Sequence, residues 1–265
     1  MGLIIKSLFF LCIIGIVVTI IFSSIYFVEY NYVRKTIADE QEIFKLEHGT
    51  LLLKQRNSDY VGWLSIADTE LNNPFFQTDD NEFYLNHDSF KKETSHGALF
   101  MDYRSELSHK NIVIYGNTKD DDLLFSTLHE YRGLNFFKTH PVITMTVAQQ
   151  KTDYKIFAVF IMNSKAKQDD EEIYNICQKD FSGEEVFYKW IKEAKERSLI
   201  STQTPLDVED NFLTLITNCD DFNGARLVVM ARQLREGEKA KEYYGATVNQ
   251  NPKLPKIWYS KRNIK

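Results

Sequence analysis

The sequence predicts a mostly β domain with peripheral helices, closed into a barrel and preceded by an N-terminal transmembrane helix. Three observations support this fold class: an uncharged apolar run at residues 7–28, a series of short strand-like runs between residues 61 and 232, and an amphipathic helical segment at 184–198. Short β-type runs with turns between them are typical of closed sheets. About 235 residues follow the apolar run, which is enough for one domain with a full core.

The apolar run at 7–28 is long enough to cross a bilayer. As a helix it spans about 33 Å, slightly more than the hydrocarbon core of a membrane. A cleaved signal peptide is the alternative, with Ser23-Ser24 as a weak cleavage site, but the apolar residues continue past it. The sequence therefore predicts a single-pass membrane anchor at residues 1–28.

Residues 29–58 carry apolar side chains at helical spacing and are predicted to form a helix or helical stalk that leaves the membrane. Packing on the domain and a free stalk are both compatible with this pattern. Positive charges flank the apolar run on both sides, at Lys6 and at Arg34 and Lys35, so the positive-inside rule does not fix the orientation.

The compact domain is predicted at residues 59–236. Its strand-like runs lie at 61–66, 98–101, 111–115, 142–147, 154–161, 212–217 and 226–232. The segment Asn72–Pro74 predicts a turn after the first run. Beyond the last run, Pro252 and Pro255 oppose helix, so residues 237–265 are predicted to form an irregular C-terminal extension.

Two helices are predicted between the strands. Asp122 is a candidate cap for a helix at 123–131. Ser182 and Glu185 have the spacing of a capping box at the start of the helix at 184–198. The helix at 184–198 is expected to lie on the surface of the barrel, because its apolar residues fall on one face.

Composition limits the partners and cofactors. The net charge is −5, with acidic and basic residues interspersed, so a nucleic-acid-binding surface is not indicated. Cys12 lies in the apolar run, which leaves Cys177 and Cys219 in the domain; a disulfide between these two is an open alternative. No cluster of His, Cys and carboxylate residues has metal-ligand spacing, so neither a metal nor another cofactor is expected.

Two segments carry the functional prediction. Residues 111–125 are NIVIYGNTKDDDLLF, and residues 211–232 are NFLTLITNCDDFNGARLVVMAR. Both resemble the catalytic segments of class B sortases, which are membrane-anchored cysteine transpeptidases of Gram-positive cell surfaces. In that family the first segment carries Tyr-Gly-His-Asn, and the second ends a strand at Thr-Leu-x-Thr-Cys with an Arg eight residues beyond the Cys.

The resemblance runs from about Asp59 to Arg235 and covers most of the domain. Further matching segments lie at 59–64, 82–87, 97–104 and 135–141. The helix at 184–198 stands where class B members carry an extra helix between two late strands. The resemblance implies a sortase-type closed β-barrel whose globular domain lies outside the cell membrane.

The resemblance also implies a reaction. In the family a Cys thiolate attacks the Thr carbonyl of a sorting motif, a His serves as acid and base, an Arg assists, and an amine of the cell wall resolves the thioester. In this sequence the gapless match puts Asn117 at the His position and Asn218 at the Cys position, while Arg226 keeps its place. An asparagine amide neither titrates near neutral pH nor acts as a strong nucleophile, so these two changes remove the family's chemistry.

Cys219, one residue beyond the family's Cys position, is the candidate replacement nucleophile. Strand side chains alternate between faces, so a regular strand points Cys219 away from the groove that Asn218 faces. A β-bulge near Thr217 would bring the thiol back, but the spacing from Asn218 to Arg226 matches the family without an insertion. A small buried residue is therefore the expected role of Cys219.

Three other features belong to the candidate site. Arg226 can bind carbonyl or carboxylate oxygens, or it can pair with Asp220 or Asp221 on the loop that precedes it. Thr217 is expected to support the site and to contribute to binding. No other histidine clearly replaces the missing one; His129 follows on the next helix, where a surface position is the more ordinary role.

Three functions remain open at the level of the sequence, and with them the question of whether the chain is an enzyme. The paired loss of Cys and His favours a degenerate class B sortase that binds a sorting-motif-type peptide, or peptidoglycan or its precursor, as an accessory module. The second is an active cysteine transpeptidase or endopeptidase that uses Cys219 as a shifted nucleophile with Arg226. The third is a structural stalk protein that uses the barrel as a scaffold.

Overall fold

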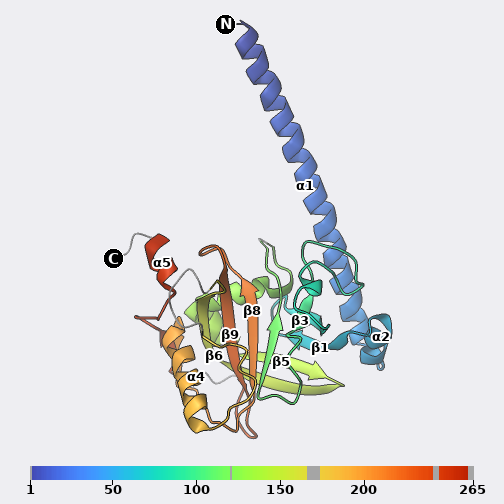
Figure 1. Ribbon diagram of the computed structural model, residues 1–265. Coiled ribbons are helices and arrows are strands. Elements are labelled where there is room, and N and C mark those ends of the chain that lie inside the picture. Colours follow the sequence, from blue (N-terminus) through green and yellow to red (C-terminus); the bar gives the residue numbers. More distant parts are fainter. Residues whose placement is uncertain (1, 120, 166–173, 241–244, 262–265) are drawn as a thin grey trace.

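A closed β-barrel forms the centre of the domain, and a long N-terminal helix projects from it (Figure 1). The computed structural model describes residues 2–119, 121–165, 174–240 and 245–261, with backbone only for 2–8 and 261. Within this part of the chain the barrel strands pair in the order β1-β2-β3-β4-β8-β9-β6-β5 and close on β1. They are β1 (Tyr60–Ser65), β2 (Asn72–Phe76), β3 (Leu99–Met101), β4 (Asn111–Tyr115), β5 (Val142–Val147), β6 (Gln150–Asn163), β8 (Phe212–Asn218) and β9 (Ala225–Gln233). The predicted fold class is confirmed.

Alternation along the strands divides the apolar residues of the barrel into two layers. The inner layer fills the barrel and includes Leu213 and Leu215 of β8, together with Cys219, which directly follows the strand. The outer layer includes Phe212 and Ile216 of the same strand, which pack against helix α4 (Glu184–Arg197). The parity that the sequence predicts for β8 is therefore the parity of the structure.

Strands β4 and β8 run side by side in the same direction, with Tyr115 opposite Ile216. Because they are parallel, the segments that follow them leave the barrel at the same end. Asn117 comes two residues after β4, and Asn218 is the last residue of β8. In Figure 1 this end of the barrel faces the side from which α1 (Gly2–Phe44) projects.

Helix α1 is continuous, so the predicted border between anchor and stalk at residue 28 is not a structural break. Its first half exposes large apolar side chains, and the part from Phe9 to Phe44 is long and apolar enough to cross a membrane. Its second half packs on the barrel and buries Val33, Thr36 and Glu40. Of the two alternatives left open by the sequence, this half is a packed helix and not a free stalk.

The remaining helical segments are short and lie around the barrel. They are α2 (Gly49–Arg56), η1 (Phe83–Leu85), η2 (Leu124–Arg132), α3 (Leu134–Thr139) and α5 (Lys256–Lys261). Helix α4 carries its buried residues Phe187, Trp190, Ile191 and Ala194 on one face, as the sequence predicts.

The turn predicted at Asn72–Pro74 is wrong, because these residues begin strand β2. Pro74 lies opposite Trp63 of β1, whereas β3 pairs only with the next two residues, Phe75 and Phe76. Proline is tolerated where a strand lacks a second neighbour, since no ladder hydrogen bond is then lost. Pro74 is therefore accommodated in a strand, because the strand has a neighbour on only one side at that position.

Both predicted helix caps are also wrong. The residue that precedes η2 is Leu123, and Asp122 makes no capping hydrogen bond. The backbone N–H of Leu123 instead donates to Oδ1 of Asp121, at 3.1 Å. At α4 the cap position is Gly183, one residue later than Ser182, so the side chain of Ser182 is out of reach for a capping box.

The C-terminal extension is more regular than predicted. Residues Thr247–Val248 form β10 and pair with β7 (Ile200–Ser201), and α5 begins directly after Pro255. Proline is compatible with the first turn of a helix, so Pro255 starts α5 and does not oppose it.

Candidate functional site

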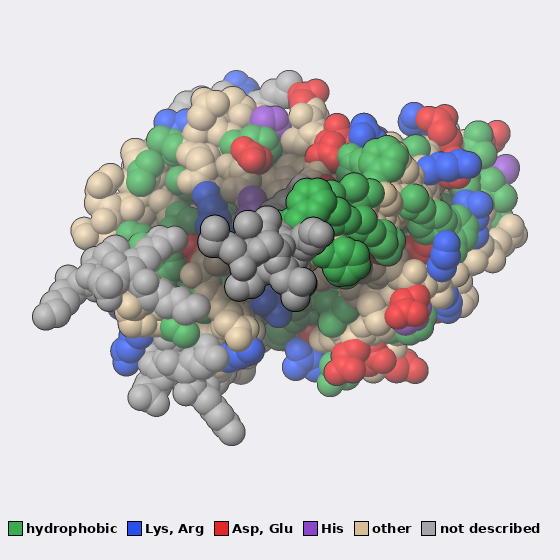
Figure 2. Space-filling model, turned by 90° about the horizontal axis from the view of Figure 1, so that it is seen from above, with side chains coloured by type: hydrophobic (Ala, Val, Ile, Leu, Met, Phe, Trp, Pro, Cys, Tyr) green, Lys and Arg blue, Asp and Glu red, His purple; other side chains and the backbone are tan. Residues whose placement is uncertain are grey.

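A cavity of about 950 Å³ lies beside the ends of β4 and β8. Figure 2 looks onto this end of the molecule, where the surface is hollowed next to α1. The lining is polar apart from one aromatic ring and consists of Tyr26, Thr118, Lys119, Asp121, Ser126, His129, Glu130, Arg132, Asn218, Asp220 and Asp221. Such a lining suits a polar ligand with several hydrogen-bonding groups.

Asn218 is held by two hydrogen bonds to the backbone of a single residue. Its Oδ1 accepts from the N–H of Thr118 at 2.9 Å, and its Nδ2 donates to the carbonyl of Thr118 at 3.0 Å. The side-chain amide therefore occupies the position that a peptide group of a neighbouring strand would have. Both ends of the amide are engaged, and the segment after β4 is fixed to the end of β8.

The side chain of Asn117 also hydrogen-bonds to the backbone. Its Nδ2 donates to the carbonyl of Leu85 at 2.7 Å and to the carbonyl of His96 at 3.2 Å. The residue does not line the cavity. Asn117 and Asn218 thus lie on either side of Thr118 and stabilise the loops around the site, without an ionisable group at either position.

Cys219 is buried in the inner apolar layer directly after β8, and it lies beside Asp221 of the cavity lining. The pairing of β8 with β9 is regular through Asn218, so no bulge turns the next residue outward. The side chain is 6% exposed, and burial raises the pKa of its thiol to about 11. Cys177 and Cys219 are both free, so the disulfide that the sequence leaves open is not formed.

Thr217 is also buried, with 1% of its surface exposed. Its Oγ1 has no hydrogen-bond partner among the described residues. By strand alternation its side chain lies on the inner face of β8, away from Asn218. The structure does not bring Thr217 to the cavity.

Arg226 begins β9 directly opposite Asn218. Its guanidinium donates to the carbonyl of Ala225 at 2.9 Å and makes no ion pair within the part of the chain that the structure describes. The pairing with Asp221 considered from the sequence is not formed, because Arg132 donates to that carboxylate at 2.7 Å. Arg226 lies next to Asn218 but does not line the cavity.

His129 is closer to the site than expected for a surface residue. It lines the cavity, and its Nε2 lies 3.1 Å from the backbone carbonyl of Asn218. Burial and the nearby charge of Arg132 lower the pKa of the imidazole. A neutral ring near pH 7 donates from Nε2 to that carbonyl, so His129 orders the end of β8.

Several lining residues were not predicted from the sequence. Tyr26 comes from α1, more than ninety residues before the loop that it faces, and Asp121 contacts it there, at 3.4 Å between the phenol oxygen and Oδ2. Arg132 ends η2 and holds Asp221. The only available signal was the spacing of Tyr26 and Tyr30, which are one helical turn apart at the end of the apolar run.

Comparison with known proteins identifies the family. The chain is 30% identical to sortase B of Listeria monocytogenes over 185 residues, which are 68% of this chain and 72% of that protein. It is 28% identical to sortase B of Staphylococcus aureus over 187 residues, which are 69% of this chain and 73% of that protein. No family model matches the sequence.

Solved structures agree with the sequence comparison. Sortase B of Clostridium perfringens matches with a TM-score of 0.63 at 32% identity, covering 70% of this chain and 99% of that structure. A Staphylococcus aureus sortase B–substrate complex matches with a TM-score of 0.70 at 26% identity, covering 79% and 100%. The shared barrel and the extent of the sequence match together show that this chain belongs to the sortase B family.

Proposed function

We propose that this chain is a degenerate, membrane-anchored sortase B that binds a sorting-type peptide outside the cell without cleaving it. The observation that carries the proposal is the engagement of Asn218, whose amide is bonded at both ends to Thr118. A cysteine at this position would need an unblocked sulfur directed at a substrate carbonyl. The residue present is instead a structural link between two loops.

The available thiols support the same proposal. Transpeptidation needs a thiolate at neutral pH. Cys219 is buried in the barrel with its pKa raised to about 11 by burial, and the pKa of Cys177 is also raised by burial. Neither cysteine lines the cavity. The alternative in which Cys219 acts as a shifted nucleophile with Arg226 is therefore disfavoured by burial, orientation and charge state.

The cavity supports binding of a polar peptide. Its lining offers hydroxyl, amide, carboxylate and cationic groups, and two of its carboxylates, Glu130 and Asp220, are exposed. A sortase B of similar fold has been solved as a substrate complex. By analogy the retained fold can hold a peptide backbone, with Arg226 beside the end of β8 as the candidate carbonyl ligand.

Membrane anchoring rests on α1. The large apolar side chains described between Phe9 and Phe22 are exposed, whereas the polar half of the helix is part of the domain. A helix of this length and composition is stable in a bilayer because its backbone groups are satisfied internally. We infer a single-pass protein with the barrel outside the cell membrane.

The test is a binding and turnover assay with the full chain in lipid nanodiscs. A panel of fluorescent sorting-type peptides is titrated by anisotropy and then incubated with a wall-type amine. We expect saturable binding without a cleavage product. Arg226→Ala should weaken binding about tenfold, whereas Lys192→Ala, a cation that is 76% exposed on α4, should not.

Turnover decides between the two functions. Product formation that disappears in Cys219→Ala would establish a shifted nucleophile and overturn the proposal. Product formation that persists in Cys219→Ala would point to another catalytic group and overturn it as well. The absence of binding by every peptide would contradict the receptor role.

A further inference from the structure

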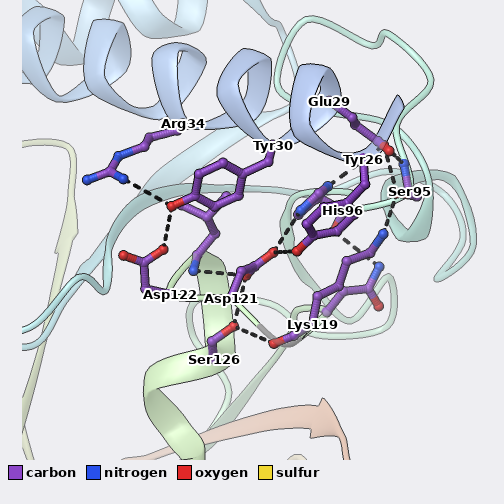
Figure 3. A network of polar contacts seen from close by, with 12 residues as sticks. Tyr26, Glu29, Tyr30, Arg34, Ser95, His96, Lys119, Asp121, Asp122 and Ser126 are labelled. Carbon is purple, nitrogen blue, oxygen red and sulfur yellow. Dashed lines mark hydrogen bonds and ion pairs between the residues drawn. The ribbon is translucent and has the colours of Figure 1, made fainter. Parts of the chain in front are cut away.

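Tyr26 joins the candidate site to the membrane helix. It is the sole contribution of α1 to the described lining of the cavity and the sole aromatic residue there. Its phenol oxygen lies 3.4 Å from Oδ2 of Asp121, and its ring lies 6.4 Å from that of His96, measured between centroids. Figure 3 shows the tyrosine directed from α1 towards these two residues. One wall of the cavity therefore belongs to the N-terminal helix.

Helix α1 is hydrogen-bonded to the loop after β4, which lines the other side of the cavity. Tyr30, one turn after Tyr26, donates to Oδ1 of Asp122 at 2.9 Å. His96 is buried, and its Nε2 lies 2.9 Å from Asp121. The loop after β4 is thus held against α1 by two adjacent carboxylates, each bound to a tyrosine of the helix (Figure 3).

A second loop is fastened to the same face of α1. Glu29 accepts from the N–H of Ser95 at 2.6 Å, from Oγ of Ser95 at 2.7 Å and from Oγ1 of Thr94 at 2.8 Å. Lys119 in turn contacts Oγ of Ser95. Positions 26, 29 and 30 fall on one face of a helix, so this stretch of the face is held by contacts with the domain. The helix cannot turn about its axis without breaking them.

The depth of Tyr26 follows from the sequence of α1. The uncharged run ends at Val28, and Glu29 is the first charged residue after it. Tyrosine is enriched at membrane–water interfaces, where its ring lies at the level of the headgroups. If the apolar half of α1 spans a bilayer, Tyr26 lies at the surface of that bilayer. The cavity that it lines then lies there too.

We propose that α1 is part of the ligand site, with Tyr26 as a specificity-determining residue, and that the site takes a polar peptide held directly at the bilayer surface. This proposal rests on the proposed peptide-binding function and extends it by naming where the peptide lies. The exposed Glu130 and Asp220 of the lining favour a peptide with a positive charge. A peptide carried far from the membrane would not reach the cavity.

The placement is tested without any ligand. A bimane label is attached at Asp220→Cys, or at Ser108→Cys, in the full chain with Cys12→Ser and Cys177→Ser, and the chain is placed in nanodiscs that contain headgroup-nitroxide lipids. Asp220 lines the cavity, and the exposed Ser108 lies at the opposite end of β4. We expect strong quenching at position 220 and little at position 108. Equal quenching, or the reverse order, would refute the placement.

The ligand is tested with a peptide that binds in the panel above, attached to a lipid through spacers of about three or about twenty residues. We expect the short spacer to give the tighter complex. Tyr26→Ala should weaken binding about tenfold, and Tyr26→Phe should show how much of this loss comes from the hydroxyl group. Phe27→Ala is the matched control, since Phe27 is 65% exposed on α1 and does not line the cavity.

The possible results separate the two proposals. Unchanged binding by folded Tyr26→Ala, or a preference for the long spacer, would overturn the inference and leave the peptide-binding function intact. Binding by no peptide, together with quenching at position 220 as expected, would end the peptide-binding function and with it the named ligand, while the membrane-facing cavity would stand. Competition by a lipid-linked glycan instead of a peptide would also overturn the choice of ligand.

Discussion

At the scale of single residues, the side-chain amides of Asn117 and Asn218 hydrogen-bond to the backbone around the site. Asn218 bonds to the backbone of Thr118, and Asn117 bonds to the carbonyls of Leu85 and His96. An amide satisfies a donor and an acceptor at once, which neither a thiol nor an imidazole does with the same geometry. These positions therefore contribute to the stability of the loops, and neither carries an ionisable group.

Replacing Asn218 by Ala should destabilise the protein by about 1–3 kcal/mol, because the N–H and C=O of Thr118 each lose a partner in a half-buried place. The free energy of unfolding is measured by denaturant titration. Asn223→Ala is the matched control, since Asn223 is exposed and its one side-chain hydrogen bond among the described residues is with Nζ of Lys165. Equal stability of the two variants would contradict the structural role of Asn218.

Cys219 should react slowly with iodoacetamide. With its pKa raised to about 11 by burial, roughly one thiol in a thousand is ionised at pH 8. The raised pKa also means that folding favours the protonated thiol, so its contribution to stability is present below pH 9 and is lost as the pH rises towards 11. Alkylation followed by mass spectrometry should show Cys177 modified before Cys219. Rapid modification of Cys219 at pH 8 in the folded protein would show that it is accessible and ionised.

Residue-level prediction from the sequence succeeded where strand alternation decides the outcome. The position of Cys219 inside the barrel follows from its parity relative to Asn218, and the structure has it there. The contacts of Tyr26, His96 and Asp121 could not be predicted, because they join segments that are distant in sequence. The assignment of Asn117 and Asn218 to the family's His and Cys positions, and the roles of Thr217 and Arg226 in binding, remain predictions.

At the scale of elements, predictions from local sequence were wrong where a contact with another part of the fold determines the conformation. Pro74 predicts a turn, but its strand has no second neighbour at that point and can include it. Asp122 predicts a helix cap, but its carboxylate is used by Tyr30 of α1. The regular elements with strong periodicity, such as α4 and β8, were predicted nearly to the residue.

The start of the C-terminal extension is attached to the barrel through the carboxylate of Glu238. Both oxygens of Glu238 accept from Arg232, each at 2.7 Å, and Oε1 also accepts from Lys155 at 3.0 Å. Arg232 is 0% exposed, so its buried positive charge is compensated by this partner. Burial opposes ionisation of Glu238, but the hydrogen bonds from Arg232, Arg235 and Lys155 outweigh it and lower its pKa to about 2.

Glu238→Gln should therefore destabilise the protein by about 3–5 kcal/mol, because it leaves buried cations without an anion. The wild-type contribution is present above pH 4.5 and is lost as the pH falls towards 2, so the difference between the two proteins should shrink in acid. Thermal unfolding from pH 7 to pH 2.5 measures both effects. The control is Glu236→Gln, at an exposed position two residues away, and a loss of the same size there would refute the assignment.

At the scale of the whole molecule, the family could be predicted because the matching segments are spread over the barrel, from Asp59 to Arg235. Such a signal does not depend on any one residue and survives the changes at positions 117 and 218. The continuity of α1 into the domain was not predicted, since the sequence shows only a change from apolar to mixed composition near Val28.

The orientation of the whole chain leads to a labelling prediction. If the barrel lies outside the cell, a membrane-impermeant amine reagent should modify exposed lysines such as Lys192 in intact cells. Lys6, on the other side of the apolar run, should be modified only after permeabilisation. Peptide mapping of the labelled protein tells the two apart. The opposite pattern would place the barrel in the cytoplasm.

The two hydrogen bonds between Asn218 and Thr118 also have a consequence for how this sequence can evolve. If position 218 is the family's cysteine position, as the sequence match predicts, restoring that cysteine removes both hydrogen bonds at once. Without a histidine at position 117 the restored thiol has no partner to activate it. A first back-mutation at either position therefore loses stability before any activity can be selected. On that prediction, no single substitution restores the family's Cys and His together.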